Sequence, residues 1–184
     1  MSRRDLTLLP SFSSKPDKLN VVIECPRGSN TKLNYKSDLD SFTLSYVMPA
    51  GISFPYAFGF IPSTRAADGD PLDVLVLMNA ATCTGCILTA RPIGVIEGNQ
   101  TENEKTFRND RLVSAAEAAP EYRDVRELKE VGDRVLDEIE HFFISYNQMR
   151  GRQFEPLRRA GRRSALKLIG EHRKAFKHHQ KKHG

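Results

Sequence analysis

The chain has 184 residues, of which 39% are hydrophobic and 28% charged, and these values favour one globular domain. It has no run of about 18 apolar residues, which argues against a transmembrane helix, and its start lacks the apolar core and cleavage site of a signal peptide. The odd set of cysteines, Cys25, Cys83 and Cys86, does not indicate a disulfide framework. We therefore expect a cytoplasmic protein with no membrane partner.

The net charge of +5 is unevenly distributed. Residues 150–184 contain 12 Lys/Arg and 2 Asp/Glu, whereas residues 1–149 contain 16 Lys/Arg and 21 Asp/Glu. Such a basic end either attracts nucleic acid or membranes or forms a solvated helix face with a frayed tail, and we favour the second interpretation. Phe and Tyr lie mainly in apolar runs and do not interleave with basic residues, so nucleic acid is not an expected partner.

The first half of the chain predicts short strands, where β-branched or apolar runs are bounded by turn residues. The turn around Cys83-Thr-Gly-Cys86 lies between such runs, which favours incidental thiols over a zinc or redox site. The expected strands cover residues 19–25, 32–35, 42–47, 74–78, 86–96 and 110–114, the last of the series.

The second half predicts helices. Apolar residues recur at spacings of three and four over residues 130–149, and a second helix is expected from Ser164 to about His178. Strands followed by helices indicate an α+β fold, and five or six short strands suit a small closed barrel with flanking helices, two of them C-terminal. We expect a flexible lead-in over residues 1–18, a single domain over 19–178 and a basic disordered tail over 179–184. The residues expected to face inward from the first helix are Val131, Val135, Ile139, Phe142, Phe143 and Tyr146.

Three carboxylates, those of Asp68, Asp70 and Asp73, fall within six residues. Gly69 permits a tight backbone path between them, and Pro71 stiffens it. Crowded carboxylates repel one another unless cations lie among them, and an all-oxygen ligand set suits hard cations such as Mg²⁺. Asp-Gly-Asp is also a common turn sequence, so the loop alone leaves metal binding and a simple turn equally open.

A magnesium cluster points to a substrate that carries phosphate. Two or more Mg²⁺ ions activate a water and neutralise the leaving phosphate, while basic side chains hold the outer oxygens. The hydroxyl of Tyr146 is a further candidate contact, although simple core packing explains this residue equally well. The candidate basic residues are Lys32, Lys36, Arg65, Arg108 and Arg111.

Several ordered motifs together resemble the soluble family I inorganic diphosphatases over roughly residues 19–150. The acidic run at residues 68–76 is similar to theirs almost residue for residue, and the preceding run, 54–64, looks like their signature. The other similar segments are Val22-Ile23-Glu24-Cys25-Pro26, Gly28-Ser29-Asn30-Thr31-Lys32, Arg91-Pro92-Ile93-Gly94-Val95 and His141-Phe142-Phe143-Ile144-Ser145-Tyr146.

The resemblance implies a five-stranded closed barrel of the OB type, hydrolysis of pyrophosphate with two or more Mg²⁺ ions, and a homo-oligomer, a hexamer in many bacterial members. It implies that Asp70 orients or deprotonates the attacking water and that Glu24 supports the metal and substrate. The implied metal ligands are Asp68, Asp70 and Asp73, and the implied phosphate contacts are Lys32, Tyr146 and Arg111.

Five positions depart from the family pattern. Where the family has a glutamate, an arginine, a tyrosine, an aspartate and a lysine, this chain has Asn34, Tyr46, Phe58, Asn109 and Asn147 respectively. The family has two aspartates shortly before the next strand, and Asn109 stands at the position of the second. Asp110, one residue later, is a weak candidate for that second acid, and Glu102 is a weak candidate for the first.

These losses fall mainly on the side that would bind the substrate anion. Two alternatives to pyrophosphate hydrolysis therefore stay open, namely hydrolysis of another phosphoanhydride in a reshaped pocket and a catalytically inactive binding module. Arginines that begin four residues after Tyr146 could compensate by folding back to the pocket mouth, or they could form a solvated face or an oligomer contact. They are Arg150, Arg152, Arg158, Arg159, Arg162 and Arg163.

Overall fold

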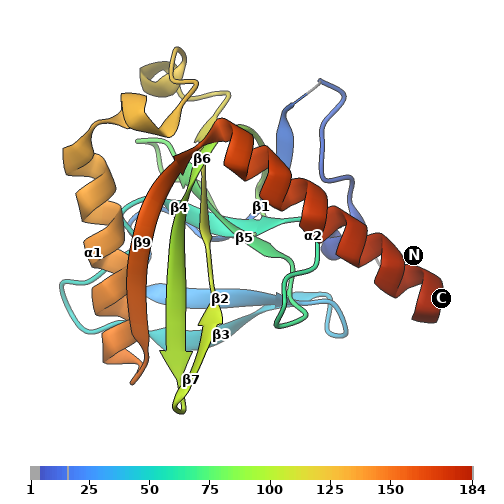
Figure 1. Cartoon of the computed structure of the whole chain (residues 1–184), viewed down its shortest axis with the longest axis horizontal. Coiled ribbons are helices and arrows are strands. Elements are labelled where there is room, and N and C mark those ends of the chain that lie inside the picture. The colour runs from blue at the N-terminus through green and yellow to red at the C-terminus, as the bar shows by residue number, and fades with distance from the viewer. Residues whose placement is uncertain (1–4, 16, 184) are drawn as a thin grey trace.

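The computed structural model describes residues 5–15 and 17–183, which form an α+β fold with nine strands (Figure 1). The helices are α1 (Asp133–Met149) and α2 (Arg162–His183), with 3₁₀ turns at Leu6–Leu8, Pro120–Tyr122 and Leu128–Val131. The strands are β1 (Leu19–Cys25), β2 (Thr31–Lys36), β3 (Ser41–Val47), β4 (Ala57–Ile61), β5 (Leu72–Leu77), β6 (Ile87–Glu102), β7 (Lys105–Arg108), β8 (Arg111–Ala116) and β9 (Gln153–Gly161).

Five of the strands close into a ring. The order is β1-β4-β5-β8-β6, and β6 pairs back onto β1, so the sheet has no free edge in this part. All of these pairings are antiparallel except β5 with β8. The expected closed five-stranded barrel is therefore confirmed.

Close strand approach inside the ring depends on Gly59 of β4. A Cβ atom built at Gly59 would lie 1.9 Å from the carbonyl oxygen of Val22 on β1, so no other residue fits without moving that strand. The family-like run before the acidic residues thus has a packing role as well, because it places β4 between β1 and β5.

Strand β6 is long enough to leave the ring and form a second surface. Beyond its barrel portion it pairs with β7 and along most of its outer half with β9, which brings the arginine-rich segment beside the sheet. The hairpin of β2 and β3 forms a separate two-stranded sheet, and β2 contacts β1 of the barrel (Figure 1).

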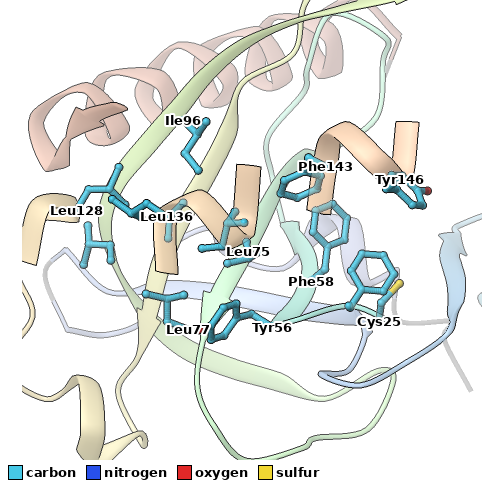
Figure 2. Close-up of a cluster of buried hydrophobic side chains, with 14 of the residues drawn as sticks. Cys25, Tyr56, Phe58, Leu75, Leu77, Ile96, Leu128, Leu136, Phe143 and Tyr146 are labelled. Atoms are coloured by element: carbon cyan, nitrogen blue, oxygen red, sulfur yellow. The ribbon is translucent and has the colours of Figure 1, made fainter. Parts of the chain in front are cut away.

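Helix α1 lies against β9 and covers one end of the barrel core. Helix α2 begins at the top of the sheet and crosses the barrel, with Ala165 and Ile169 in the core, and its C-terminal end projects beyond the sheet (Figure 1). The buried face of α1 includes Ile139, Phe143 and Tyr146 of the predicted apolar stripe and adds Leu136, which was not predicted. Val135 and Phe142 are half-buried, and Val131 lies in the 3₁₀ turn before the helix, which begins at Asp133 and not at residue 130. Figure 2 shows Phe143 packed beside Phe58 and, farther along the helix, Tyr146 with its hydroxyl at the edge of the cluster.

Several sequence expectations need correction. Strands β4, β7 and β9 were not predicted, so β8 is not the last strand. The second helix begins at Arg162 and continues to His183, beyond the expected end near His178. The adjacent Arg158 and Arg159, together with Pro156, leave β9 without an apolar pattern, and pairing with β6 decides its conformation.

No helix in the described residues is both long and apolar enough to cross a membrane.

Candidate active site

A cavity of about 630 Å³ opens between the barrel, the acidic loop, the end of α1 and one side of α2. This volume is in the range of pockets that bind small molecules. Eight of the nine predicted site residues line it, and Glu24 borders a small adjoining cavity that also reaches Asp70 and Asp73. The eight are Lys32, Asp68, Asp70, Asp73, Glu102, Asp110, Arg111 and Tyr146.

The acidic loop, residues 66–73, is held by its backbone. The amide of Ala66 donates to the carbonyl of Asp70 over 2.7 Å, and Arg65 donates to the carbonyl of Gly69 over 2.9 Å. Gly69 has a φ of 94°, a conformation that favours glycine. The loop shape therefore needs no ion pair from the carboxylates of Asp68 and Asp70, and neither makes one with any residue the structure describes.

The hydroxyl of Thr64 fixes the point where this loop enters β5. It donates to the carbonyl of Ile61 over 2.5 Å and accepts from the amide of Leu72 over 2.9 Å. Both ends of the loop are thereby tied to each other through one buried side chain, and Asp73 follows directly on the strand.

Asp73 differs from the other two loop acids because it has a cation partner. Arg111 on β8 donates to Asp73 over 2.9 Å, and 39% of the Asp73 side chain is open to the cavity. Loss of hydration beside the surrounding protein raises the pKa of Asp73, while the charges of Arg111 and Lys32 act in the opposite direction. The guanidinium of Arg111 lies over the rings of Phe143 and Phe154. Burial lowers the pKa of Arg111, and the charge of Asp73 acts in the opposite direction.

Lys32 and Glu24 form a buried ion pair beside the loop. The Lys32 ammonium donates to Glu24 over 2.7 Å and lies 4.6 Å from the centre of the Phe58 ring. The other Glu24 oxygen accepts from the amide of Tyr35. Burial alone would lower the pKa of Lys32, but the nearby carboxylates of Glu24 and Asp73 outweigh it and raise that pKa.

The two weaker acid candidates are also paired. Glu102 accepts from Arg152 over 2.7 Å, and Asp110 accepts from Arg108 and from the amide of Gly98. Both carboxylates line the cavity, but their charges are already balanced by arginines, unlike those of Asp68 and Asp70.

The substituted positions have new neighbours. The amide of Asn147 is buried and donates to the carbonyl of Phe143, so it closes a turn of α1. The ring of Tyr46 packs edge-on against Tyr146. Asn109 donates to Gln100, which also accepts from Arg111 at 3.4 Å. Phe58 supplies the ring beneath Lys32 in place of a hydroxyl.

The arginine-rich segment divides into two groups. Arg150 and Arg152 line the cavity, as the sequence hypothesis requires. Arg158, Arg159 and Arg162 instead pair with Glu97, with acids of α1 and with Asp17, away from the cavity.

Sequence reasoning missed Gln100 and His172 as cavity residues. Gln100 gave no signal because it lies inside a long strand, and His172 was read as part of a solvated helix. The amide of Arg65 donates to the carbonyl of His172, so α2 also supports the chain just before the acidic loop.

The cavity offers few protein donors for a divalent cation. Within residues 5–15 and 17–183, no three carboxylate, histidine or cysteine side chains converge closely enough to form a metal site by themselves. Mg²⁺ keeps several waters and commonly takes one or two carboxylates, which the unpaired Asp68 and Asp70 offer. Asn34 adds a buried amide oxygen with no hydrogen-bond partner in the described structure, at the cavity wall. The residues therefore fit Mg²⁺ that is completed by waters and substrate.

Unpaired carboxylates beside buried cations and a tyrosine define a site of the kind that hydrolyses phosphate compounds with hard metal ions. The comparisons with known proteins are more specific. The family model described as inorganic pyrophosphatase matches residues 21–177, so this chain belongs to the inorganic pyrophosphatase family.

Individual relatives agree with that assignment. The inorganic pyrophosphatase of Nostoc sp. is 37% identical over 145 residues, which cover 79% of this chain and 83% of that protein. That of Synechocystis sp. is 35% identical over 173 residues, covering 94% and 99%. The crystal structure of inorganic pyrophosphatase from Thermus thermophilus matches with a TM-score of 0.86 and 29% identity, covering 95% of this chain and 99% of that one.

Proposed function

We propose that this chain hydrolyses inorganic pyrophosphate to two phosphate ions with Mg²⁺ as cofactor. The observation that carries the proposal is the acidic loop, whose Asp68 and Asp70 carboxylates face a cavity without cation partners among the described residues. In a member of the inorganic pyrophosphatase family, we expect such a loop to bind metal ions whose remaining ligands are waters and substrate oxygens.

Asp68, Asp70 and Asp73 hold the metal ions, with two or more ions expected from the crowding of three acids. Glu24 acts through Lys32, and Asp110 and Glu102 are weaker candidate ligands because arginines already pair with them. When bound, Mg²⁺ lowers the pKa of a water and neutralises charge on the phosphate oxygens.

The protein's own groups then have separate tasks. Asp70 accepts a proton from the attacking water while the oxygen of that water forms a bond to one phosphorus. The bond from that phosphorus to the bridging oxygen breaks, and the second phosphate leaves with the bonding electrons. Lys32, Arg111 and the Tyr146 hydroxyl hold the outer oxygens in line for this displacement.

The direct test is phosphate release from pyrophosphate with Mg²⁺, using Asp70→Asn as the decisive variant. We expect Asp70→Asn to lose about 10²–10⁴-fold in rate, the usual contribution of a positioned acid or base. Asp124→Asn is the matched control, because Asp124 is exposed and lies outside the cavity lining. An Asp70→Asn enzyme with the wild-type rate would contradict the proposed role.

A different phosphoanhydride is the second candidate substrate. Asn34, Tyr46 and Asn147 leave the substrate-binding side without the charges that the family resemblance implies. Rates with pyrophosphate, tripolyphosphate and a nucleoside triphosphate, each with Mg²⁺, rank the substrates. A tripolyphosphate rate well above the pyrophosphate rate would favour the second candidate.

We further propose a cytoplasmic homo-oligomer, with a hexamer as the expected assembly. Free cysteines suit a reducing compartment, and the β2–β3 hairpin exposes Leu39, Leu44 and Val47. Light scattering after size-exclusion chromatography tests the assembly, and a monomer at micromolar concentration would contradict it.

A further inference from the structure

The cations that line the cavity are not equivalent. Lys32 pairs with Glu24, Arg108 with Glu97 and Asp110, Arg111 with Asp73, and Arg152 with Glu102. Arg150 lines the same cavity but makes no ion pair with any described residue. Among the arginines of the cavity wall, Arg150 is thus the one whose charge no carboxylate in the described residues balances.

The position of Arg150 is nevertheless fixed. Its guanidinium donates to the Tyr146 hydroxyl over 2.6 Å and lies 5.4 Å from the ring centres of both Tyr46 and Tyr146. Its backbone amide donates to the carbonyl of Asn147, and Gly151, at a φ of 70°, turns the chain away from the helix. An arginine is therefore held in one place by two aromatic rings and a helix end.

This arrangement leaves two kinds of donor for a ligand. Arginine has five N–H donors, of which the described structure uses one side-chain donor here, so several remain. The Tyr146 oxygen accepts from Arg150, which leaves the hydroxyl hydrogen to donate elsewhere, and no described group accepts it. A cation and a hydroxyl donor held side by side match the oxygens of a phosphoryl group.

We infer that Arg150 and the Tyr146 hydroxyl form an anion-binding subsite for one phosphoryl group of the substrate. Tyr46, at a position where a cation was expected, serves as the aromatic platform for Arg150. The inference rests on the proposed function for the identity of the substrate, but the subsite itself follows from the geometry of three side chains. The anion-binding charge has moved from positions 46 and 147 to the C-terminal end of α1.

A purely structural role for Arg150 gives different expectations. A cation at a helix C-terminus interacts favourably with the helix dipole, and that role concerns stability and not ligand affinity. Arg150→Lys would preserve it, whereas a lysine cannot stack between two rings or offer a planar pair of donors. Ligand affinity therefore separates the subsite from simple helix capping.

The test measures binding of methylenediphosphonate, a pyrophosphate analogue that is not hydrolysed, by titration calorimetry with saturating Mg²⁺. We expect Arg150→Ala to weaken this binding, and to raise KM for pyrophosphate, by about 10- to 100-fold, as for a lost charged hydrogen bond. Arg150→Gln, which can still donate to Tyr146, provides a second uncharged variant in case the alanine variant does not fold. The affinity of Arg150→Lys for methylenediphosphonate should lie between those of the wild type and Arg150→Ala. Tyr146→Phe should bind it more weakly than the wild type.

Arg158→Ala is the matched control, because Arg158 belongs to the same segment, is exposed and pairs with Glu97 outside the cavity lining. Wild-type affinity in Arg150→Gln or Arg150→Ala, or no binding of methylenediphosphonate by the wild type, would overturn the subsite. Binding that depends on Arg150 in a wild type that releases no phosphate from pyrophosphate would uphold the subsite and refute the proposed function.

Discussion

The acidic loop and the cation-bearing elements of the cavity differ in how their charges are balanced. On the loop, Asp68 and Asp70 are exposed and have no ion-pair partner in the described residues, and the backbone holds their positions. Across the cation-bearing elements, Lys32 and Arg111 are buried and each contacts a carboxylate. One region thus keeps its charge available, while the other has most of its charge neutralised within the protein.

The difference follows from burial. A buried charge costs free energy unless it is paired, so the buried Lys32 and Arg111 need Glu24 and Asp73. Exposed carboxylates remain hydrated, so they need no partner within the protein and stay available to a ligand. In the function proposed above, the negative excess at the loop attracts divalent cations, and these supply much of the positive charge that a pyrophosphate ion needs.

The largest effect should come from removing the cations that the loop selects. An excess of chelator should abolish phosphate release while the far-ultraviolet circular dichroism stays unchanged, because the backbone and not the metal shapes the loop. Added Mg²⁺ should restore the rate. Full activity in excess chelator would contradict the distinction between the two regions, because the unpaired acids of the loop would then need no cation for catalysis.

The next effect concerns the paired region. Lys32→Met leaves Glu24 buried without its cation, and breaking a buried pair costs about 3–5 kcal/mol. Chemical denaturation measures the loss in free energy of unfolding. The double variant Glu24→Gln/Lys32→Met should recover much of the stability but not the activity, because no cation remains for the substrate.

The control for that pair is Lys18→Met, because Lys18 pairs with Glu117 at the surface, outside the cavity lining. Equal losses for the surface and the buried lysine would show that burial does not distinguish the two regions. A stable, fully active Lys32→Met enzyme would remove Lys32 from the substrate contacts.

A smaller effect tests how the backbone holds the loop. Thr64→Val keeps the shape of the side chain but leaves the buried amide of Leu72 without an acceptor, a loss of about 1–3 kcal/mol. The rate should fall as well, because Asp70 and Asp73 lose their common anchor. Thr106→Val on the exposed hairpin is the matched control, and calorimetric melting with initial rates measures both quantities.

The sequence predicted much of the barrel and placed the acidic loop and Lys32, Arg111 and Tyr146 together, because local patterns and family-like motifs specify these features. It did not predict β9, whose conformation comes from pairing with β6. Nor did the sequence predict which arginine stays unpaired. That depends on which carboxylates lie nearby in space, as Glu102 does for Arg152 and none does for Arg150 in the described structure.

The smallest effect is expected at the cysteines. The turn that carries Cys83 and Cys86 supports β1 through other groups: Thr84 donates to the carbonyl of Glu24 over 3.0 Å, and the amide of Gly85 donates to that of Ile23 over 2.8 Å. Neither thiol contributes to these contacts, so Cys83→Ser/Cys86→Ser should change the free energy of unfolding by no more than about 0.5 kcal/mol and leave the rate unaltered.

A thiol titration in the native state sharpens this last prediction, because the thiolate is the reactive form. Burial raises the pKa of Cys25 to about 11, although Lys32 acts against it, so Cys25 is protonated and inaccessible near neutral pH. Cys83 is exposed and should react first with a disulfide reagent at pH 8, Cys86 more slowly, and Cys25 only after unfolding. Loss of activity in step with Cys83 modification, combined with a fully active double serine variant, would indicate steric blocking by the added group. Loss of activity in the serine variant itself, with the fold intact, would show that the turn takes part in function after all.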